Sequence, residues 1–284
     1  MTLKEKKEKK DQFVVAYLCD LDATDGCVAQ AQMLAQGVGK GLILLHISDS
    51  QYTRIEPEEA EEKLKEINAG VSDQLFHSYL ALKGRSRDIL HSLGEALNAV
   101  AIVAQMRAGE NDVKRPWHPS TLLKNLSLSR TAYMIVGQDF HPTGFDKVVM
   151  SVNQLQESKE KTLWASYFGR FFGSEIILYY RDYKDEYHKK QLTLNLNFTR
   201  KMFSHFGLTS SEHHSGDNRT PLDVQALGYA KECGCSMIIC QTTKNKSFFE
   251  YFFGLEEEKV LKNMGSDCAA LFLNPRDDLF VMCE

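Results

Sequence analysis

The sequence predicts an α/β protein of two tandem doubly wound domains, each a five-stranded parallel sheet flanked by helices. Three observations predict this fold class. Short apolar runs alternate with longer segments of helical period along the chain. The same succession of segments occurs twice, which relates the two domains by an approximate two-fold axis. The length of 284 residues suits two domains of about 140 residues, each large enough to bury a core.

The repeat appears as a series of matched residues whose offset drifts slowly. An offset of 134 aligns Gly39 with Gly173. Further along, residues 123–125 and 261–263 both read Leu-Lys-Asn, at an offset of 138. Small loop insertions between two copies of one unit explain this drift, whereas chance matches would not keep their order.

The repeat and the composition together divide the chain. A charged N-terminal extension, rich in Lys and Glu, is expected at residues 1–12. The first domain is expected at residues 13–140 and the second at 145–284. The turn-rich segment 141–144, His-Pro-Thr-Gly, joins them. A connector this short keeps the two domains adjacent.

Ten short segments are predicted as strands, most of them apolar runs and the others placed by the repeat. Parallel strands covered by helices on both faces read as nearly continuous apolar runs, which is the pattern here. Each half supplies five of them. The segments are 13–19, 42–47, 77–82, 99–104 and 132–136, then 147–152, 175–180, 210–214, 236–240 and 269–273.

The longer segments between these runs are predicted as helices. Pro57 and Pro221 stand in expected first turns, where a missing amide is tolerated, and Thr220 is placed to cap. Glycines follow four helical stretches, at positions 39, 173, 207 and 234. The predicted helices are 24–36, 57–68, 86–97, 121–126, 159–172, 186–206, 221–232 and 256–263.

Composition excludes several classes of partner. The chain has 34 Lys plus Arg against 38 Asp plus Glu, a formal net charge of -4, so no broad basic surface for nucleic acid is expected. No apolar stretch approaches the roughly 20 residues that span a bilayer, and the first residues lack the form of a secretion signal. The seven cysteines are odd in number and lie mostly in apolar runs, which indicates reduced thiols and a cytoplasmic location.

The repeat unit resembles the universal stress protein family over residues 13–137 and 146–274. The resemblance lies in an opening strand followed by a polar turn, at 14–22 and 148–156. It continues in the passages LAQGVGKGLILLHIS and YFGRFFGSEIILYYRD, and in the endings LLKNLSLSRTAYMIV and VLKNMGSDCAALFL. It implies an adenine-nucleotide α-hydrolase-like fold, often found as a dimer, and tandem proteins in which two copies in one chain replace that dimer.

The phosphate loop that marks ATP-binding members of this family, G-x2-G-x9-G-[S/T], is where the sequence departs. In the second half Gly254 aligns with the third glycine, while Gln241 and Lys244 replace the first two. In the first half Pro116 takes the third position, and Gly109 is the only glycine of the loop. Such glycines let backbone N–H groups approach phosphate oxygens, so we interpret both loops as degenerate.

Side chains offer an alternative way to hold an anion in these loops. Lys244, Lys246 and Ser247 could do so in the second half, and Arg107 in the first. Lysines next to a loop are equally consistent with ordinary solvation.

The resemblance also implies a ligand position at the end of the first strand, where an aspartate meets the adenine and ribose. Asp20 matches it, with Asp22 close by, and the repeat places Asn153 or Gln154 there in the second half. Amides still hydrogen-bond a purine edge, but they lack the charge of a carboxylate. An alternative makes Asp20 and Asp22 turn residues that cap the helix from Thr24.

These positions define the candidate site. No cofactor is expected from the degenerate loops, and ATP or AMP is the alternative ligand. No metal site is expected, because Cys233, Cys235 and Cys240 lack zinc-ligand spacing. The candidate ligand-contacting residues are Asp20, Asp22, Arg107, Gly109, Asn153, Gln154, Thr242, Lys244 and Gly254.

An aromatic run at residues 248–253 contains four Phe and one Tyr. Exposed, it would suit a protein partner, a second copy of the chain or an apolar ligand. Buried, it would fill the volume that a nucleotide occupies in relatives. Trp117, in the matching part of the first half, has the same two interpretations.

The first functional hypothesis is a non-enzymatic, stress-associated protein that acts through protein contacts, homodimer formation among them, and does not bind ATP in the usual way. The sequence has no G-x-S-x-G elbow, no G-x-G-x-x-G after an opening strand and no P-loop lysine motif. The alternative is a nucleotide-binding module that uses altered loops and hydrolyses ATP weakly. A carrier of apolar ligands built on the aromatic run is a third hypothesis.

Overall fold

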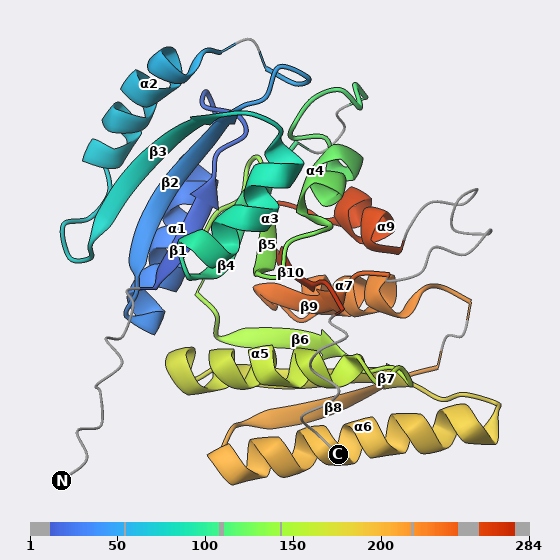
Figure 1. The fold of residues 1–284 in the computed structure, drawn as a ribbon. Helices are drawn as coiled ribbons and strands as arrows, with labels where there is room; N and C mark the ends of the chain where they lie inside the picture. Colours follow the sequence, from blue (N-terminus) through green and yellow to red (C-terminus); the bar gives the residue numbers. More distant parts are fainter. Residues whose placement is uncertain are drawn as a thin grey trace, which may run out of the picture.

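The computed structural model describes residues 12–53, 55–107, 111–142, 144–216, 219–243 and 256–275. Its strands form one ten-stranded sheet in the order β3-β2-β1-β4-β5-β10-β9-β6-β7-β8 (Figure 1). The first half contributes β1 (Phe13–Tyr17), β2 (Gly41–Ser48), β3 (His77–Lys83), β4 (Ala99–Met106) and β5 (Ala132–Gly137). The second contributes β6 (Lys147–Ser151), β7 (Glu175–Arg181), β8 (Ser210–Ser215), β9 (Met237–Gln241) and β10 (Ala269–Leu273).

The strand order is the same in both halves, and a single antiparallel pair joins them. β1 lies between β2 and β4, as β6 lies between β7 and β9. Within each half the paired strands are parallel. β5 and β10 run antiparallel, with Tyr133 opposite Phe272 and Ile135 opposite Ala270. The doubly wound fold class is confirmed, and the two five-stranded sheets join edge to edge, which protects one edge of each.

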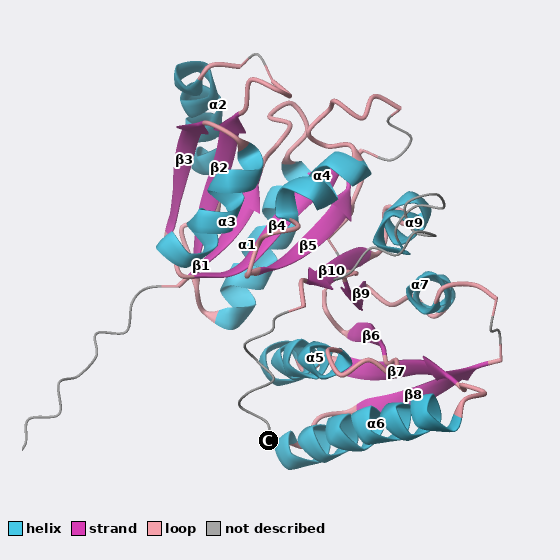
Figure 2. Ribbon diagram, turned by 45° about the vertical axis from the view of Figure 1, so that its right-hand side comes forward, coloured by secondary structure: helices cyan, strands magenta, loops and turns pink. Residues whose placement is uncertain are grey.

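Helices cover both faces of the sheet (Figure 2). On one face lie α1 (Asp25–Val38), α2 (Pro57–Ala69), α5 (Ser158–Phe172) and α6 (Glu186–Phe206). On the other lie α3 (Ser86–Ala96), α4 (Pro119–Leu126), α7 (Leu222–Glu232) and α9 (Glu256–Asn263). Within the described residues, none of these helices has the length and apolarity needed to cross a lipid bilayer.

Two apolar cores, one on each face, hold the layers together. Because strand residues alternate between faces, Val14 and Ala16 of β1 enter one core while Val15 and Tyr17 enter the other. All four are almost completely buried. This two-sided burial explains why the inner strands, such as β1 and β10, are visible in the sequence as unbroken apolar runs.

Glycine ends three of the helices, as the sequence predicts. Gly39, Gly173 and Gly207 follow α1, α5 and α6 with φ values of 63°, 68° and 63°. Backbone with positive φ strains residues that carry a Cβ, which is why glycine occupies these positions.

The predicted cap of α7 is wrong. The helix begins at Leu222, and the residue before it is Pro221, which forms no side-chain cap. The backbone carbonyl of Thr220 instead accepts hydrogen bonds from Arg181 Nη1 at 2.9 Å and Gln225 Nε2 at 2.5 Å. Thr220 therefore anchors the loop before the helix.

Candidate functional site

The two candidate sites lie where β1 and β4, or β6 and β9, end side by side. In a doubly wound sheet the chain leaves these neighbouring strands toward opposite faces, which leaves a crevice beyond their carboxyl ends. Of the candidate residues, Asp20 and Arg107 follow β1 and β4, and Asn153 and Thr242 follow β6 and β9. The structure thus brings five of the described candidates together in two groups, Asp20 with Arg107 in the first half and Asn153 and Gln154 with Thr242 in the second.

In the first half, two of the candidate residues bind each other at the crevice. The Arg107 guanidinium donates from Nη2 to Asp20 Oδ2, and the Asp20 side chain is 7% exposed. Arg107 also lies over the Trp117 ring, with Cζ 4.5 Å from the ring centroid, and its backbone N–H donates to the Trp117 carbonyl at 3.2 Å. Arg107, predicted to hold phosphate, therefore forms an ion pair with Asp20, predicted to contact adenosine.

Asp20 and Asp22 form a turn and do not cap α1. Asp20 Oδ1 accepts the backbone N–H of Asp22 at 3.2 Å. The residue before α1 is Thr24, which makes no side-chain cap bond. Asp22 points to solvent, where it pairs with Lys63 at 2.9 Å. The turn interpretation is confirmed for both aspartates, and the capping interpretation is wrong.

Breaking the Asp20 ion pair is expected to destabilise the fold. Asp20→Asn leaves the Arg107 charge unpaired beside an apolar core, at a cost of about 2 kcal/mol, below that of a fully buried pair because Arg107 is partly exposed. Asp22→Asn is the matched control, since its exposed pair with Lys63 contributes at most about 0.5 kcal/mol. Urea denaturation followed by circular dichroism measures both. Equal losses in the two variants would contradict this account.

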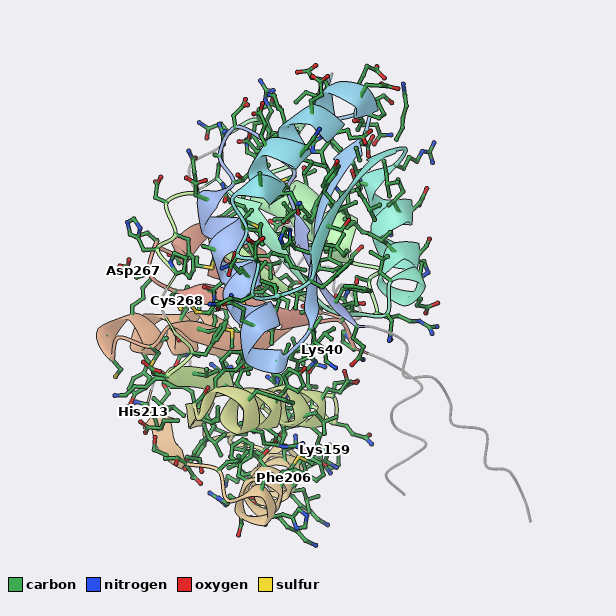
Figure 3. The ribbon with its side chains drawn as sticks, turned by 90° about the vertical axis from the view of Figure 1, so that its left-hand side faces the viewer. Lys40, Lys159, Phe206, His213, Asp267 and Cys268 are labelled. Carbon is green, nitrogen blue, oxygen red and sulfur yellow. The ribbon has the colours of Figure 1, made fainter. Side chains whose placement is uncertain are left out.

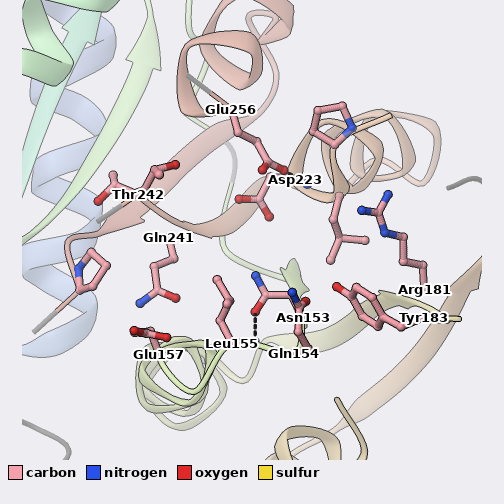
Figure 4. A pocket seen from close by; sticks show the side chains of 14 residues that line it. Asn153, Gln154, Leu155, Glu157, Arg181, Tyr183, Asp223, Gln241, Thr242 and Glu256 are labelled. Atoms are coloured by element: carbon pink, nitrogen blue, oxygen red, sulfur yellow. Dashed lines mark hydrogen bonds between the residues drawn. The ribbon is translucent and has the colours of Figure 1, made fainter. Parts of the chain in front are cut away.

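In the second half the corresponding crevice is an open cavity of about 430 Å³ (Figure 4). Its walls come from the ends of β6, β7 and β9 and from the first residues of α7 and α9. It therefore lies at the switch in strand order, where the sequence placed a ligand. The lining residues are Asn153, Gln154, Leu155, Glu157, Arg181, Tyr183, Pro221, Leu222, Asp223, Gln241, Thr242, Thr243, Glu256 and Pro275.

Three of the candidate residues of the second half line this cavity. Asn153 Oδ1 accepts the N–H of Leu155 at 3.1 Å, which folds the loop after β6 into a turn. Gln154 follows it in the wall. Thr242 donates from Oγ1 to Asn274 Oδ1 at 2.7 Å, which ties the end of β9 to the residue that follows β10.

The remaining candidates lie outside the described residues. Gly109, Lys244 and Gly254 belong to this group, and so do Lys246 and the aromatic run at residues 248–253. The interpretations given to them from the sequence stay predictions.

The sequence interpretation missed the acidic residues of the cavity. Asp223 lies in the first turn of α7 and Glu256 is the first residue of α9, and the Asp223 N–H donates to Glu256 Oε1 at 3.1 Å. Burial, and after it the charge of Asp223, raise the pKa of Glu256 to about 7. One signal was available, because the repeat aligns Asp223 with Asp88, which gives both halves an aspartate in the first turn of the matching helix.

The cysteine and histidine residues form no metal site in the described part of the chain, where no three potential ligands stand close enough to share an ion. His213 stacks against Tyr179 and Tyr229, with centroid separations of 5.2 and 4.0 Å. It lies apart from Cys268 (Figure 3). Burial raises the pKa of Cys235 to about 11 and of Cys268 to about 12, so both thiols stay protonated at neutral pH.

Comparison with known proteins identifies the fold. No family model and no curated protein matches the sequence. A universal stress protein from Archaeoglobus fulgidus DSM 4304 superposes with a TM-score of 0.69 at 15% identity, over 94% of this chain and 97% of that one. The chain has the fold of a universal stress protein.

Two structures from Pseudomonas aeruginosa share this universal-stress-protein fold. One, from strain UCBPP-PA14, is provisionally described as a universal stress protein and has a TM-score of 0.62 at 16% identity, covering 96% of this chain and 95% of that one. The other, a functionally unknown protein from strain PAO1, has a TM-score of 0.63 at 14% identity, covering 95% and 94%. All three matches span nearly the whole chain, which includes both halves of the sheet.

Among the described residues, the lining of the second-half cavity carries more acidic than basic side chains. Three carboxylates line it, from Glu157, Asp223 and Glu256, against the single guanidinium of Arg181. Arg181 is turned toward a backbone carbonyl, to which its Nη1 donates at 2.9 Å. Burial and the neighbouring charge of Asp223 raise the pKa of Glu256 to about 7, so this carboxyl group is partly protonated near neutral pH.

Proposed function

We propose that this chain is a tandem universal-stress-protein-like protein that acts in a stress response through contacts with other proteins, without catalysis and without bound ATP. The observation that carries the proposal is the ion pair of Asp20 with Arg107, stacked on Trp117. A nucleotide entering the first half would have to break this pair and desolvate both charges again. The fold shared with universal stress proteins supports the stress-related role.

The second half supports the same proposal in a different way. Its cavity is open, but Asp223, Glu256 and Glu157 line it where a phosphate chain would need cations or free backbone amides. One half therefore excludes a nucleotide by occupancy and the other excludes its phosphates by charge.

Calorimetric titration of the nucleotide-free chain with ATP and AMP tests this proposal. We expect no binding heat and an unchanged melting temperature at about 1 mM ligand, whereas a Kd of about 10 μM would add about 2.7 kcal/mol of stability. Micromolar binding that is lost in Asp20→Ala or Asn153→Ala would overturn the proposal.

A nucleotide-binding module with altered loops is the second candidate, and the cavity of about 430 Å³ beside Asn153 and Thr242 favours it. This candidate predicts that denaturing the purified chain releases a stoichiometric adenine nucleotide, detectable by chromatography. If no nucleotide is released and the titrations show no binding heat, the nucleotide-binding candidate is refuted and the protein-contact proposal remains.

A further inference from the structure

Gln241, at the end of β9, has a side-chain amide without a partner. Both Nε2 and Oε1 are buried and make no hydrogen bond within the described part of the chain. The matching residue of the first half, Gln105, donates from Nε2 to the Ala23 carbonyl at 2.6 Å. In Figure 4 the Gln241 side chain points into the cavity. A buried amide is costly to leave unpaired, so Gln241 is suited to a polar group that the described residues do not supply.

The opposite wall of the cavity carries a close pair of carboxylates. Asp223 of α7 and Glu256 of α9 lie together in Figure 4, bonded through the Asp223 N–H. The other charged groups that act on Glu256 are its neighbour Glu257 and the buried Lys161 of α5. Lys161 Nζ is directed to Ser151 Oγ, at 2.9 Å. Burial is the main cause of the raised pKa of Glu256, and the charge of Asp223 comes next, while the charge of Lys161 acts in the opposite direction.

Apolar and aromatic side chains complete the cavity. Tyr183, Leu155, Leu222 and Pro221 line it together with the polar groups. An aromatic face attracts cations, and a volume of about 430 Å³ suits an organic molecule with an apolar body. A bare metal ion does not fit, because no group of three potential ligands converges in the described residues.

We propose that this cavity binds a small organic cation, a primary amine or amidine. Its charged head lies between the carboxylates of Asp223 and Glu256, and a neutral polar group of the ligand pairs with the Gln241 amide. The apolar body packs against Leu155 and Tyr183. The proposal concerns the second half alone and stands whether or not the chain acts through protein contacts.

A matched pair of probes tests the charge requirement on the full chain. Tyramine and tyrosol differ only in an ammonium in place of a hydroxyl. We expect tyramine to bind, by titration calorimetry at about pH 8, at least about tenfold more tightly than tyrosol. Agmatine, a primary amine, and benzamidine, an amidine, extend the set of cations. Equal binding of tyramine and tyrosol, or no binding by any of the three cations, would overturn the proposal.

Variants locate the binding in this cavity. Asp223→Asn is expected to weaken binding of the best cation about tenfold or more, since it removes one carboxylate and keeps the side-chain shape. Glu232→Gln, an exposed position at the far end of α7, is the control and should leave binding unchanged. Binding should also weaken as the pH falls to about 5.5, because Glu256 becomes neutral. Unchanged affinity in a folded Asp223→Asn variant would place the cation elsewhere and refute the site.

The ATP titration tests the proposed function independently of the amine site. ATP binding would contradict the protein-contact proposal and leave the amine result to be judged on its own probes. Failure of all three cations would refute the amine site and leave the protein-contact proposal intact.

Discussion

Tyr133→Ala is expected to lower the free energy of unfolding by about 3–5 kcal/mol, the range for removing a buried aromatic ring. Tyr133 of β5 is fully buried and stacks on Phe272 of β10, with ring centroids 5.7 Å apart. These two residues face each other across the only antiparallel pair of the described sheet. The cavity left by the ring therefore lies at the junction of the two halves, where it weakens the contact between them.

Tyr133→Phe is the control for this variant, since it keeps the ring and removes only the hydroxyl. That hydroxyl donates to Asn274 Oδ1 at 3.4 Å, so a loss of about 1 kcal/mol or less is expected. Urea denaturation monitored by circular dichroism compares both variants with the parent chain. A loss below about 1 kcal/mol for Tyr133→Ala would show that the junction does not depend on this stack.

Glu256→Gln is expected to stabilise the protein, by on the order of 2–3 kcal/mol at about pH 8.5. Burial, followed by the charge of Asp223, raises the pKa of Glu256 to about 7 from an ordinary 4.5. The native state therefore holds the proton more tightly than the unfolded state. The stabilisation that comes from this tighter proton binding is complete below the pKa that Glu256 has in the unfolded state. It is lost as the pH rises through about 7.

The stabilisation by Glu256→Gln should accordingly depend on pH. Glutamine retains an oxygen that accepts the Asp223 N–H and removes the buried charge. The gain should fall below about 1 kcal/mol at about pH 5, where the native state of the parent chain already holds a neutral Glu256. Glu232→Gln, on the exposed end of α7, should show no such trend. A gain that is equal at both pH values would mean that the charge of Glu256 is not its cause.

Element positions could be predicted from the sequence because each carries a local signal. α6 was expected at 186–206 and is found at Glu186–Phe206, where Gly207 ends it. β10 was expected at 269–273 and is found at Ala269–Leu273. Its five residues are all buried, so the strand reads as a plain apolar run. The pairing of strands between the two halves has no such local signal. The antiparallel pairing of β5 with β10 therefore could not be predicted from the sequence.

The candidate sites, too, could be predicted from the sequence only in part. Asp20 and Arg107 were each identified from the sequence, but as separate contacts for a ligand. Their ion pair joins positions 87 residues apart, and nothing local indicates it. The acidic wall of the cavity was missed because Asp223 and Glu256 read as ordinary first-turn acids, which favour a helix N-terminus wherever it lies. Only the packing of α7 against α9 makes them neighbours.

Because both halves lie in one chain, the residues at the two crevices can differ, as the ion pair of Asp20 with Arg107 and the open cavity beside Gln241 do. In a symmetric assembly of identical subunits, every substitution is present in both crevices. An arginine that pairs with an aspartate in one crevice therefore does so in the other. Here the two sides of the β5 and β10 seam are encoded separately. A substitution on one side therefore leaves the residues of the other side unchanged.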